Sequence, residues 1–262
     1  MTISAMHVAK TGLNAQQTRL QVISNNLANV NTTGFKRDRA NFETLLYQVS
    51  RPAGAPTSEG TALTSSLAVG TGVRVVSTEK LNSQGALATT ENALDVAVDG
   101  QGFLQVLLPD GRIGYTRDGA LSRSADGLLT TASGYPLQPE ITIPEGASSI
   151  VFSADGSVTA IPAGEAEPQE LGQLTIATFG NPRGLEPMGE NFMGETAASG
   201  PAVVLAPMTA GAGKIVQGAL ESSNVNVVQE LVDMIETQRA YEISSKVISA
   251  ADDMLKFVSN SL

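Results

Sequence analysis

The two ends of the chain carry apolar residues at alternating spacings of three and four, and this pattern most constrains the fold. Near the start the series is Met6, Ala9, Leu13, Gln16, Leu20, Ile23, Leu27 and Val30. Near the end it is Val227, Leu231, Met234 or Ile235, Ala240, Ile243, Val247, Ala250, Met254 and Phe257. A repeat of about 3.5 residues predicts helices that pack along a coiled-coil seam. We therefore expect two terminal helices whose apolar stripes need partners.

The charge distribution supports pairing of the two ends. The chain has a net charge of −10, which disfavours nucleic acid as a partner. Residues 1–40 hold five basic side chains and one acid, whereas residues 215–262 hold seven acids and three bases. Opposite charges favour association of the ends, within one chain or between neighbours. The alternative is that this charge imbalance arose by chance on helix faces exposed to solvent.

Between the helices the apolar pattern changes to the period of two that is typical of strands. We expect helices over 3–30 and 224–258, the second capped by Ser222, Ser223 or Asn224, and a short helix or extended arm over 35–48. Residues 50–72, rich in Pro, Gly, Ser and Thr, predict an irregular extended loop. Five Asp-Gly pairs, the first at Asp99-Gly100, predict type I′ hairpin turns. Strands are expected at 73–80, 94–98, 102–108, 112–117, 128–131, 136–143, 149–153, 157–161 and 171–179.

Residue types that carry enzyme chemistry are scarce. The chain has one histidine, His7, and no cysteine, so a zinc site or a nucleophile paired with histidine is not expected. Most carboxylates of the β region lie in Asp-Gly turns, where Asp caps local backbone. We predict no enzyme activity, no cofactor and no metal.

No apolar stretch reaches the roughly 18 residues of a membrane span. The first residues lack a charged segment followed by an apolar one, so we expect no cleavable secretory signal. Direct membrane insertion is not expected.

Four blocks of sequence resemble the bacterial flagellar rod and hook axial proteins. Residues 24–37 (SNNLANVNTTGFKR) resemble the N-terminal signature of that family, and residues 93–106 and 115–138 resemble the opening blocks of its β domain. Residues 218–254 resemble its C-terminal helix motif. The signature residues are Ser24, Asn26, Leu27, Ala28, Asn29, Asn31, Thr32, Gly34, Phe35 and Lys36. The C-terminal motif is Gln238, Arg239, Ala240, Tyr241 and Glu242.

The resemblance implies an α+β fold in which terminal helices form a coiled-coil core and a mainly antiparallel β domain is inserted between them. It implies three parts: a core of 1–34 with 218–262, a connecting segment of 35–80 with 205–217 that includes an extended loop at 49–72, and an outer β domain of 81–204. The expected self-assembly seam is Met6, Ala9, Leu13, Leu20, Ile23, Leu27, Val30, Leu231, Ile235, Ile243, Val247 and Met254. The side chains of Asn25, Asn26, Asn29 and Asn31 either cap the first helix or fix the register of stacked subunits.

The function implied by the resemblance is a structural subunit of the flagellar drive shaft that polymerises helically and transmits torque from motor to hook. Length and residues 42–75 resemble the distal-rod branch of the family. Implied partners are further copies of the chain, other rod subunits, hook protein, the ring bushing proteins and the flagellar type III export apparatus. The implied location is the basal-body rod across the periplasm. We also expect the stretch 49–69 to set the bending stiffness of the polymer.

Three alternatives remain open from the sequence. The chain could be a hook or proximal-rod-border subunit, although its length and residues 42–75 disfavour this. A secreted β-rich enzyme that acts on polysaccharide would need a pair of acids in a cleft, and no two acids are marked as a pair. A free binding module such as an adhesin would not need seam-forming helices at both ends.

Overall fold

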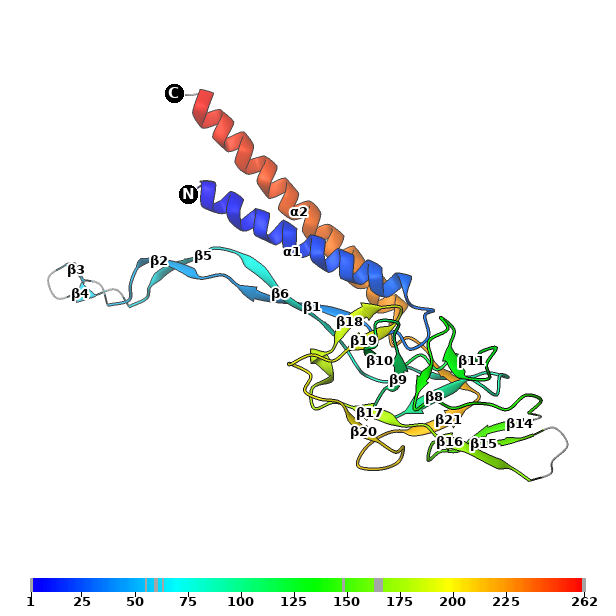
Figure 1. Ribbon diagram of the computed structural model, residues 1–262. Coiled ribbons are helices and arrows are strands. Elements are labelled where there is room, and N and C mark those ends of the chain that lie inside the picture. Colours follow the sequence, from blue (N-terminus) through cyan, green and yellow to red (C-terminus); the bar gives the residue numbers. More distant parts are fainter. Residues whose placement is uncertain are drawn as a thin grey trace. The chain divides into compact units, whose positions relative to one another are not determined.

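The structure is a computed structural model that describes residues 2–54, 56–58, 61–62, 64–147, 149–162 and 167–260 (Figure 1). It divides into two compact units. Unit 1 contains Met1–Leu27, Asp38–Glu79 and Asn226–Leu262. Unit 2 contains Ala28–Arg37 and Lys80–Val225. Two helices and many antiparallel strands confirm the α+β class.

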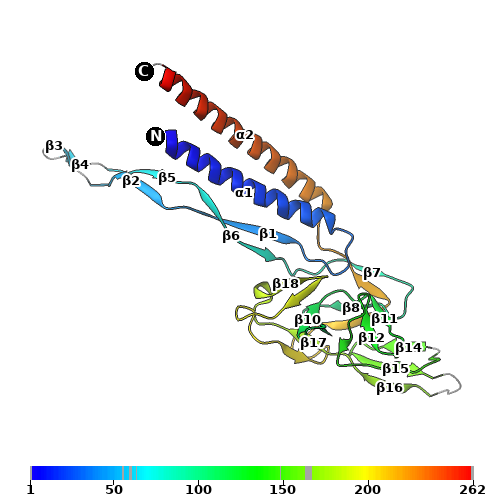
Figure 2. The same ribbon diagram turned by 45° about the horizontal axis from the view of Figure 1, so that its top comes forward.

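In unit 1, the helices α1 (Thr2–Ala28) and α2 (Val227–Asn260) lie alongside each other (Figures 1 and 2). They run antiparallel, because Arg19 lies 3.7 Å from Asp233 and Asn26 lies 3.3 Å from Glu230. The backbone N–H of Gln229 donates to Asn226 Oδ1 at 3.2 Å. Asn226 therefore caps α2, instead of the three earlier residues expected from the sequence.

The first helix ends at Ala28, two residues before the predicted end, so the expected seam residue Val30 lies beyond it. Gly34 adopts a φ of +66° in the turn that follows. A Cβ at this glycine would lie 2.6 Å from the backbone carbon of Arg117, within unit 2. Both the dihedral and the close approach favour glycine at this position.

Much of the described part of 50–72 forms paired strands, so the expectation of an irregular loop was wrong for those residues, while 52–54, 64–66 and 71–72 lie outside the strands. In unit 1, β1 (Asp38–Thr44) pairs with β6 (Val73–Lys80), and β2 (Tyr47–Arg51) pairs antiparallel with β5 (Leu67–Gly70). Short strands β3 (Pro56–Ser58) and β4 (Thr61–Ala62) pair beyond them. Alternating apolar residues such as Val49 and Val69 suit strands despite the nearby Pro and Gly. Residues 55, 59, 60 and 63 lie outside the described residues.

The ribbon contacts α1 closely at one glycine. Gly72 has a φ of +122°, and a Cβ there would lie 2.1 Å from Thr11 Oγ1. The N–H of Val73 donates to the same oxygen at 3.4 Å, and His7 Nδ1 lies 3.3 Å from the carbonyl oxygen of Thr71. A side chain at position 72 would therefore separate the ribbon from the helix.

Unit 2 consists of several small antiparallel sheets. Its central sheet has the strand order β13-β9-β10-β19-β18, and the others pair β8 with β21, β7 with β22, β11 with β12, β17 with β20, and β15 with both β14 and β16. The central strands are β9 (Leu104–Leu107), β10 (Ile113–Thr116), β13 (Leu137–Gln138), β18 (Glu186–Gly189) and β19 (Phe192–Gly194). The remaining strands are β7 (Leu87–Thr89), β8 (Val96–Asp99), β11 (Leu121–Arg123), β12 (Leu129–Thr131), β14 (Ser149–Phe152), β15 (Ser157–Ile161), β16 (Gln169–Gln173), β17 (Ile176–Thr178), β20 (Val203–Leu205), β21 (Lys214–Gln217) and β22 (Ala219–Glu221). A 3₁₀ turn, η1 (Pro182–Gly184), precedes β18.

Unit 2 has a large hydrophobic core cluster and a smaller one that contains Phe103, Tyr115, Ala177, Leu185 and Met193, and the large one joins most of these sheets. The buried members of the large cluster include Val96, Leu104, Leu129, Ile141 and Ile176, each exposed by 1% or less. Most predicted strands agree with the observed ones, but the predicted strand 136–143 is reduced to Leu137–Gln138. Residues 181–214, expected to be loops, contain β18, β19 and β20. Their strands are only three or four residues long, which is too short for a period-two pattern to stand out.

The Asp-Gly turns differ from the predicted type. Gly111, Gly127 and Gly156 have φ between +80° and +85°, whereas no Asp in the described residues has a positive φ. A type I′ turn needs positive φ at both central residues. At each site the glycine N–H donates to the residue three positions back, as Gly111 does to Leu108 at 3.0 Å. These loops are therefore type I turns closed by a glycine in the left-handed region, a common form of three-residue hairpin loop.

Candidate assembly surface

The second helix presents two chemically different faces. The face toward α1 is polar or small: Glu230, Thr237 and Ala251 are buried, and Ser244 Oγ lies 3.9 Å from the position of a Cβ on Gly12. Hydroxyls on this face bond within the helix, since Thr237 Oγ1 donates to the carbonyl of Asp233 at 2.6 Å. The intramolecular helix pair thus uses few large apolar side chains.

The large apolar side chains of α2 face away from that contact. We call them the α2 stripe: Val228, Leu231, Val232, Ile235, Ile243, Val247, Met254 and Phe257, which are between 43% and 76% exposed. The five expected seam residues of this helix, Leu231, Ile235, Ile243, Val247 and Met254, all belong to the stripe. Burying a fully exposed side chain of this kind contributes about 1.5–3 kcal/mol, so half-exposed ones retain about half of that for a partner.

The expected seam of α1 is covered more fully. Ala9 and Ile23 are buried, and Met6, Leu13, Leu20 and Leu27 are half-buried. Val30, beyond the helix, is also half-buried. The two predicted seams therefore do not meet as equivalent apolar surfaces within one chain. Assembly of the seam between chains stays a prediction.

The N-terminal signature divides into buried and exposed members. Asn26, Gly34, Phe35 and Lys36 are buried, Leu27, Asn29 and Thr32 are half-buried, and Ser24, Ala28 and Asn31 are exposed. In unit 1, Asn26 Oδ1 accepts the N–H of Asp38 at 2.8 Å, and its Nδ2 donates to the carbonyl of Asp38 at 2.9 Å. Nδ2 also donates to Glu230 Oε2 at 3.3 Å. The amide of Asn26 thereby connects α1, β1 and α2. This role within one chain differs from the two roles expected from the sequence, which were helix capping and fixing the register of stacked subunits.

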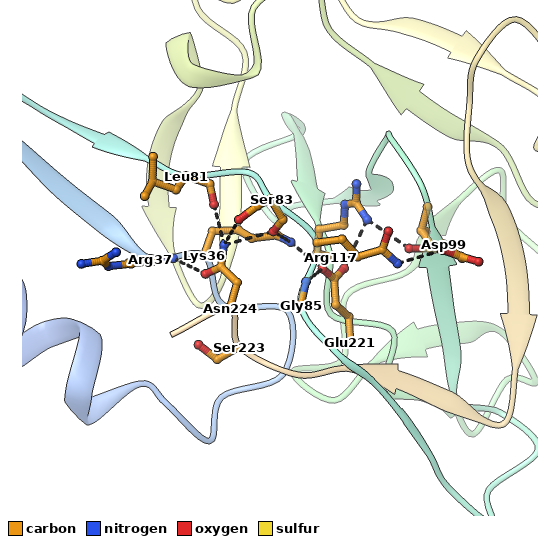
Figure 3. A network of polar contacts seen from close by, with 12 residues as sticks. Lys36, Arg37, Leu81, Ser83, Gly85, Asp99, Arg117, Glu221, Ser223 and Asn224 are labelled. Atoms are coloured by element: carbon orange, nitrogen blue, oxygen red, sulfur yellow. Dashed lines mark hydrogen bonds and ion pairs between the residues drawn. The ribbon is translucent and has the colours of Figure 1, made fainter. Parts of the chain in front are cut away.

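In unit 2, Lys36 belongs to a buried ionic cluster. Figure 3 shows Lys36 and Arg117 converging on Glu221. Lys36 Nζ donates to Glu221 Oε1 at 2.5 Å, and Arg117 Nη1 donates to Glu221 Oε2 at 3.2 Å. The exposed fractions of the three side chains are 2%, 6% and 0%. The N–H of Gly85 adds a bond of 2.8 Å to Glu221 Oε1.

Asn224 completes the cluster from the segment just after β22. Its Oδ1 accepts the N–H of Arg37 at 2.7 Å, and its Nδ2 donates to the carbonyls of Leu81 and Ser83 at 2.7 and 3.0 Å (Figure 3). The signature, the segment 81–85 and the segment 219–224 are therefore held together by one set of polar contacts. The cluster therefore links three segments of unit 2 that are far apart in the sequence.

Burial shifts two pKa values in the cluster. Burial lowers the pKa of Lys36, and the hydrogen bond and charge of Glu221 oppose that shift. The pKa of the Arg117 guanidinium is likewise lowered by burial, against the attraction of Glu221. Two cations thus face one anion in a dry environment, and Glu221 compensates only part of their charge.

The C-terminal motif lies on the middle of α2. Gln238, Arg239, Tyr241 and Glu242 are exposed, and Ala240 is half-buried. The carbonyl of Ala240 accepts a bond of 2.9 Å from Ser244 Oγ. The motif is consequently placed where it is accessible to another molecule, apart from its alanine.

The sequence reasoning missed Glu221, Arg117 and Glu230 as structural residues. All three lie inside blocks that carry the family resemblance, 115–138 and 218–254. A polar residue in such a block signals a role, but only the fold reveals that Glu221 and Arg117 meet. Among the described residues, neither helix is long and apolar enough to cross a membrane. The described part of the chain contains no group of three or more Asp, Glu or His side chains that could bind a metal ion.

Three family models match the chain. They are described as a flagella basal body rod protein over residues 6–36, a flagellar hook protein FlgE/F/G D1 domain over 97–160, and a flagellar basal body rod FlgEFG protein C-terminal region over 216–261. The chain is similar along nearly its whole length to proteins named flagellar basal-body rod protein FlgG. Two from Buchnera aphidicola, of the Schizaphis graminum and Acyrthosiphon pisum subspecies, are 52% and 51% identical over 98% of this chain and 99% of theirs. One from Agrobacterium fabrum is 46% identical over 98% of this chain and 99% of its own.

Proposed function

The chain belongs to the FlgG family of flagellar basal-body rod proteins, and on that basis we propose how it assembles. It is a structural subunit of the distal rod of the flagellar basal body, and it assembles with other rod and hook components. We propose that copies polymerise helically into a shaft that crosses the periplasm and transmits torque to the hook. The ring bushing proteins and the type III export apparatus are proposed as further partners.

The observation that carries the proposal is the α2 stripe. The helix buries its polar face against α1 and leaves the eight large apolar side chains of the stripe exposed. A soluble monomer gains nothing from such a stripe, whereas a polymer buries it between subunits. A surface that contacts a different surface of the next copy generates an open helical filament when the rotation between copies does not close into a ring.

We propose that the three parts expected from the sequence describe the assembled subunit. Residues 1–34 with 218–262 form the inner coiled-coil core, residues 35–80 with 205–217 connect it, and residues 81–204 face outward. In the free chain the division falls elsewhere, since residues 28–34 and 205–225 belong to unit 2.

The test places one carboxylate within the stripe. Ile243 is 62% exposed, so Ile243→Asp leaves the free chain folded. In a packed seam an unpaired carboxylate costs several kcal/mol, which raises the critical concentration for tube formation by at least about a hundredfold. Light scattering across a concentration series, with electron microscopy of the products, measures this value.

The matched control is Ser245→Asp, which adds the same charge to an exposed position of α2 outside the stripe. We expect this variant to assemble like the parent chain. If Ile243→Asp forms straight tubes at the parent's critical concentration, the stripe is not the assembly surface. If both variants fail equally, added charge on the helix is responsible and the stripe has no special role.

A further inference from the structure

Unit 2 contains a cavity next to the buried ionic cluster. Its volume is about 310 Å³, and it is lined by Phe103, Arg117, Phe179, Gln101, Asn82 and Pro182, with three small residues between them. Gln101 and the neighbouring Gly180 are exposed, so the cavity opens to the surface of the unit. The space is sufficient for one side chain or a molecule of similar size.

The wall of this cavity is positively charged. Arg117 lines it, and Arg117 and Lys36 share the single carboxylate of Glu221. Three side chains that are together almost fully buried thus carry one positive charge in excess. Buried charge without a counter-charge is costly, and an anion placed in the adjoining space lowers that cost.

Two buried donors beside the cavity lack an acceptor. Arg117 donates through Nη1 to Val98 O and Glu221 Oε2, and through Nη2 to Gly100 O, but its Nε–H has no partner. The Nδ2 group of Asn82, which also lines the cavity, has none. Guanidinium and amide donors are the groups that bind a carboxylate most readily.

The aromatic rings complete the site. Phe103 and Phe179 meet edge to face with ring centroids 5.9 Å apart, and the Arg117 guanidinium lies 5.3 Å from the Phe103 ring centre. The apolar walls exclude water around the guanidinium, and in such a setting a charged hydrogen bond is stronger than at the surface. They also favour a ligand with a short apolar stem.

We propose that this cavity receives an aspartate or glutamate side chain of a second copy of the chain. The inference rests on the proposed polymer, in which neighbouring copies present their side chains at high effective concentration. The chain offers 26 acids against 16 basic residues, so acidic side chains are the abundant complement to a cationic cavity. In the polymer, this charged hydrogen bond would connect the β units of neighbouring copies, in addition to the apolar contact between their helices.

The experiment compares two isosteric substitutions that add the same charge. Gln101→Glu places a carboxylate at the mouth of the cavity, where it competes with the incoming one. Gln169→Glu adds the same charge to β16, at an exposed position that does not line the cavity. We expect Gln101→Glu to raise the critical concentration for assembly about tenfold, equivalent to about 1.4 kcal/mol, and Gln169→Glu to leave it unchanged.

A second measurement tests the carboxylate preference on the dilute full chain. The ¹⁵N–¹H resonance of Arg117 Nε should shift in a saturable manner with sodium acetate and not with sodium chloride at equal ionic strength. The shift should be weaker in Gln101→Glu, because that carboxylate already occupies the cavity. Equal effects of the two substitutions on assembly, or no specific response to acetate, would overturn the proposal. If the parent chain forms no tubes at all, the proposed function itself fails.

Discussion

Replacing Glu221 with glutamine tests whether the buried ionic cluster holds unit 2 together. The substitution keeps the shape of the side chain but removes the carboxylate that faces Lys36 at 2.5 Å and Arg117 at 3.2 Å. Both cations are then buried without a counter-charge. Breaking a buried ion pair in this way costs about 3–5 kcal/mol, so we expect the free energy of unfolding to fall by that amount.

The matched comparison is Lys36→Met, which removes the other end of the same contact. Here Arg117 and Glu221 remain a balanced pair, and an apolar chain replaces a cation whose pKa burial already lowers. The lost charged hydrogen bond is worth about 1.5–3 kcal/mol, and relief of the buried charge offsets part of it. Lys36→Met should therefore cost less than about 2 kcal/mol.

The pH dependence gives an independent signature. Because the folded-state pKa of Lys36 lies below its unfolded value, the unfolded chain binds more protons between the two values. The stability of the parent chain should therefore gain a contribution from Lys36 as pH rises from the folded to the unfolded pKa. Lys36→Met should lack this contribution. In Glu221→Gln it should be larger, since the opposing influence of Glu221 is gone.

Urea unfolding of the dilute chain, followed by circular dichroism, measures these differences. In thermal unfolding, a loss of 3–5 kcal/mol lowers Tm by about 6–20 °C for a domain of 150–250 residues. If Glu221→Gln is no more destabilising than Lys36→Met, the cluster does not hold an excess positive charge in solution. The interpretation that Glu221 compensates the buried charge of Lys36 in unit 2 would then be wrong.

Three further predictions concern unit 1. Gly72→Ala should destabilise the contact of the ribbon with α1 by about 1–3 kcal/mol, because the new side chain combines a positive φ with a clash at Thr11. Hydrogen exchange of the α1 amides measures this loss, and an unchanged exchange rate would contradict the prediction. In dilute parent chain, amides of 6–27 should exchange quickly, since the helix pair buries few large apolar side chains; strong protection there would show that the pair is stable without neighbours. Deleting 49–69 should leave a subunit whose tubes are curved or flexible in electron micrographs, because a two-stranded ribbon with exposed apolar side chains is marginal alone and gains stability by lying on a neighbour. Straight tubes of unchanged stiffness would show that the ribbon is only a tether.

The sequence alone was sufficient for the features that depend on local pattern. The period of the apolar residues predicted both terminal helices to within a few residues, and the switch to a period of two located most strands of unit 2. Local patterns failed where strands are short, as for β18 to β20, and where β-forming residues lie among Pro and Gly, as for β2 and β5. The resemblance of four blocks indicated the family, which the full-length relatives confirmed.

Only the tertiary structure decided what each patterned residue contacts. The sequence treats Ile23 and Ile243 as equivalent seam positions, yet one is 4% exposed and the other 62%. The difference arises because α2 turns its polar face, with Glu230, toward α1, and a helical period cannot specify which face meets which neighbour. Likewise, Lys36, Arg117 and Glu221 are far apart in the chain, and no spacing links them. Their charges matter because the fold removes them from water together, and burial is a property of the assembled structure.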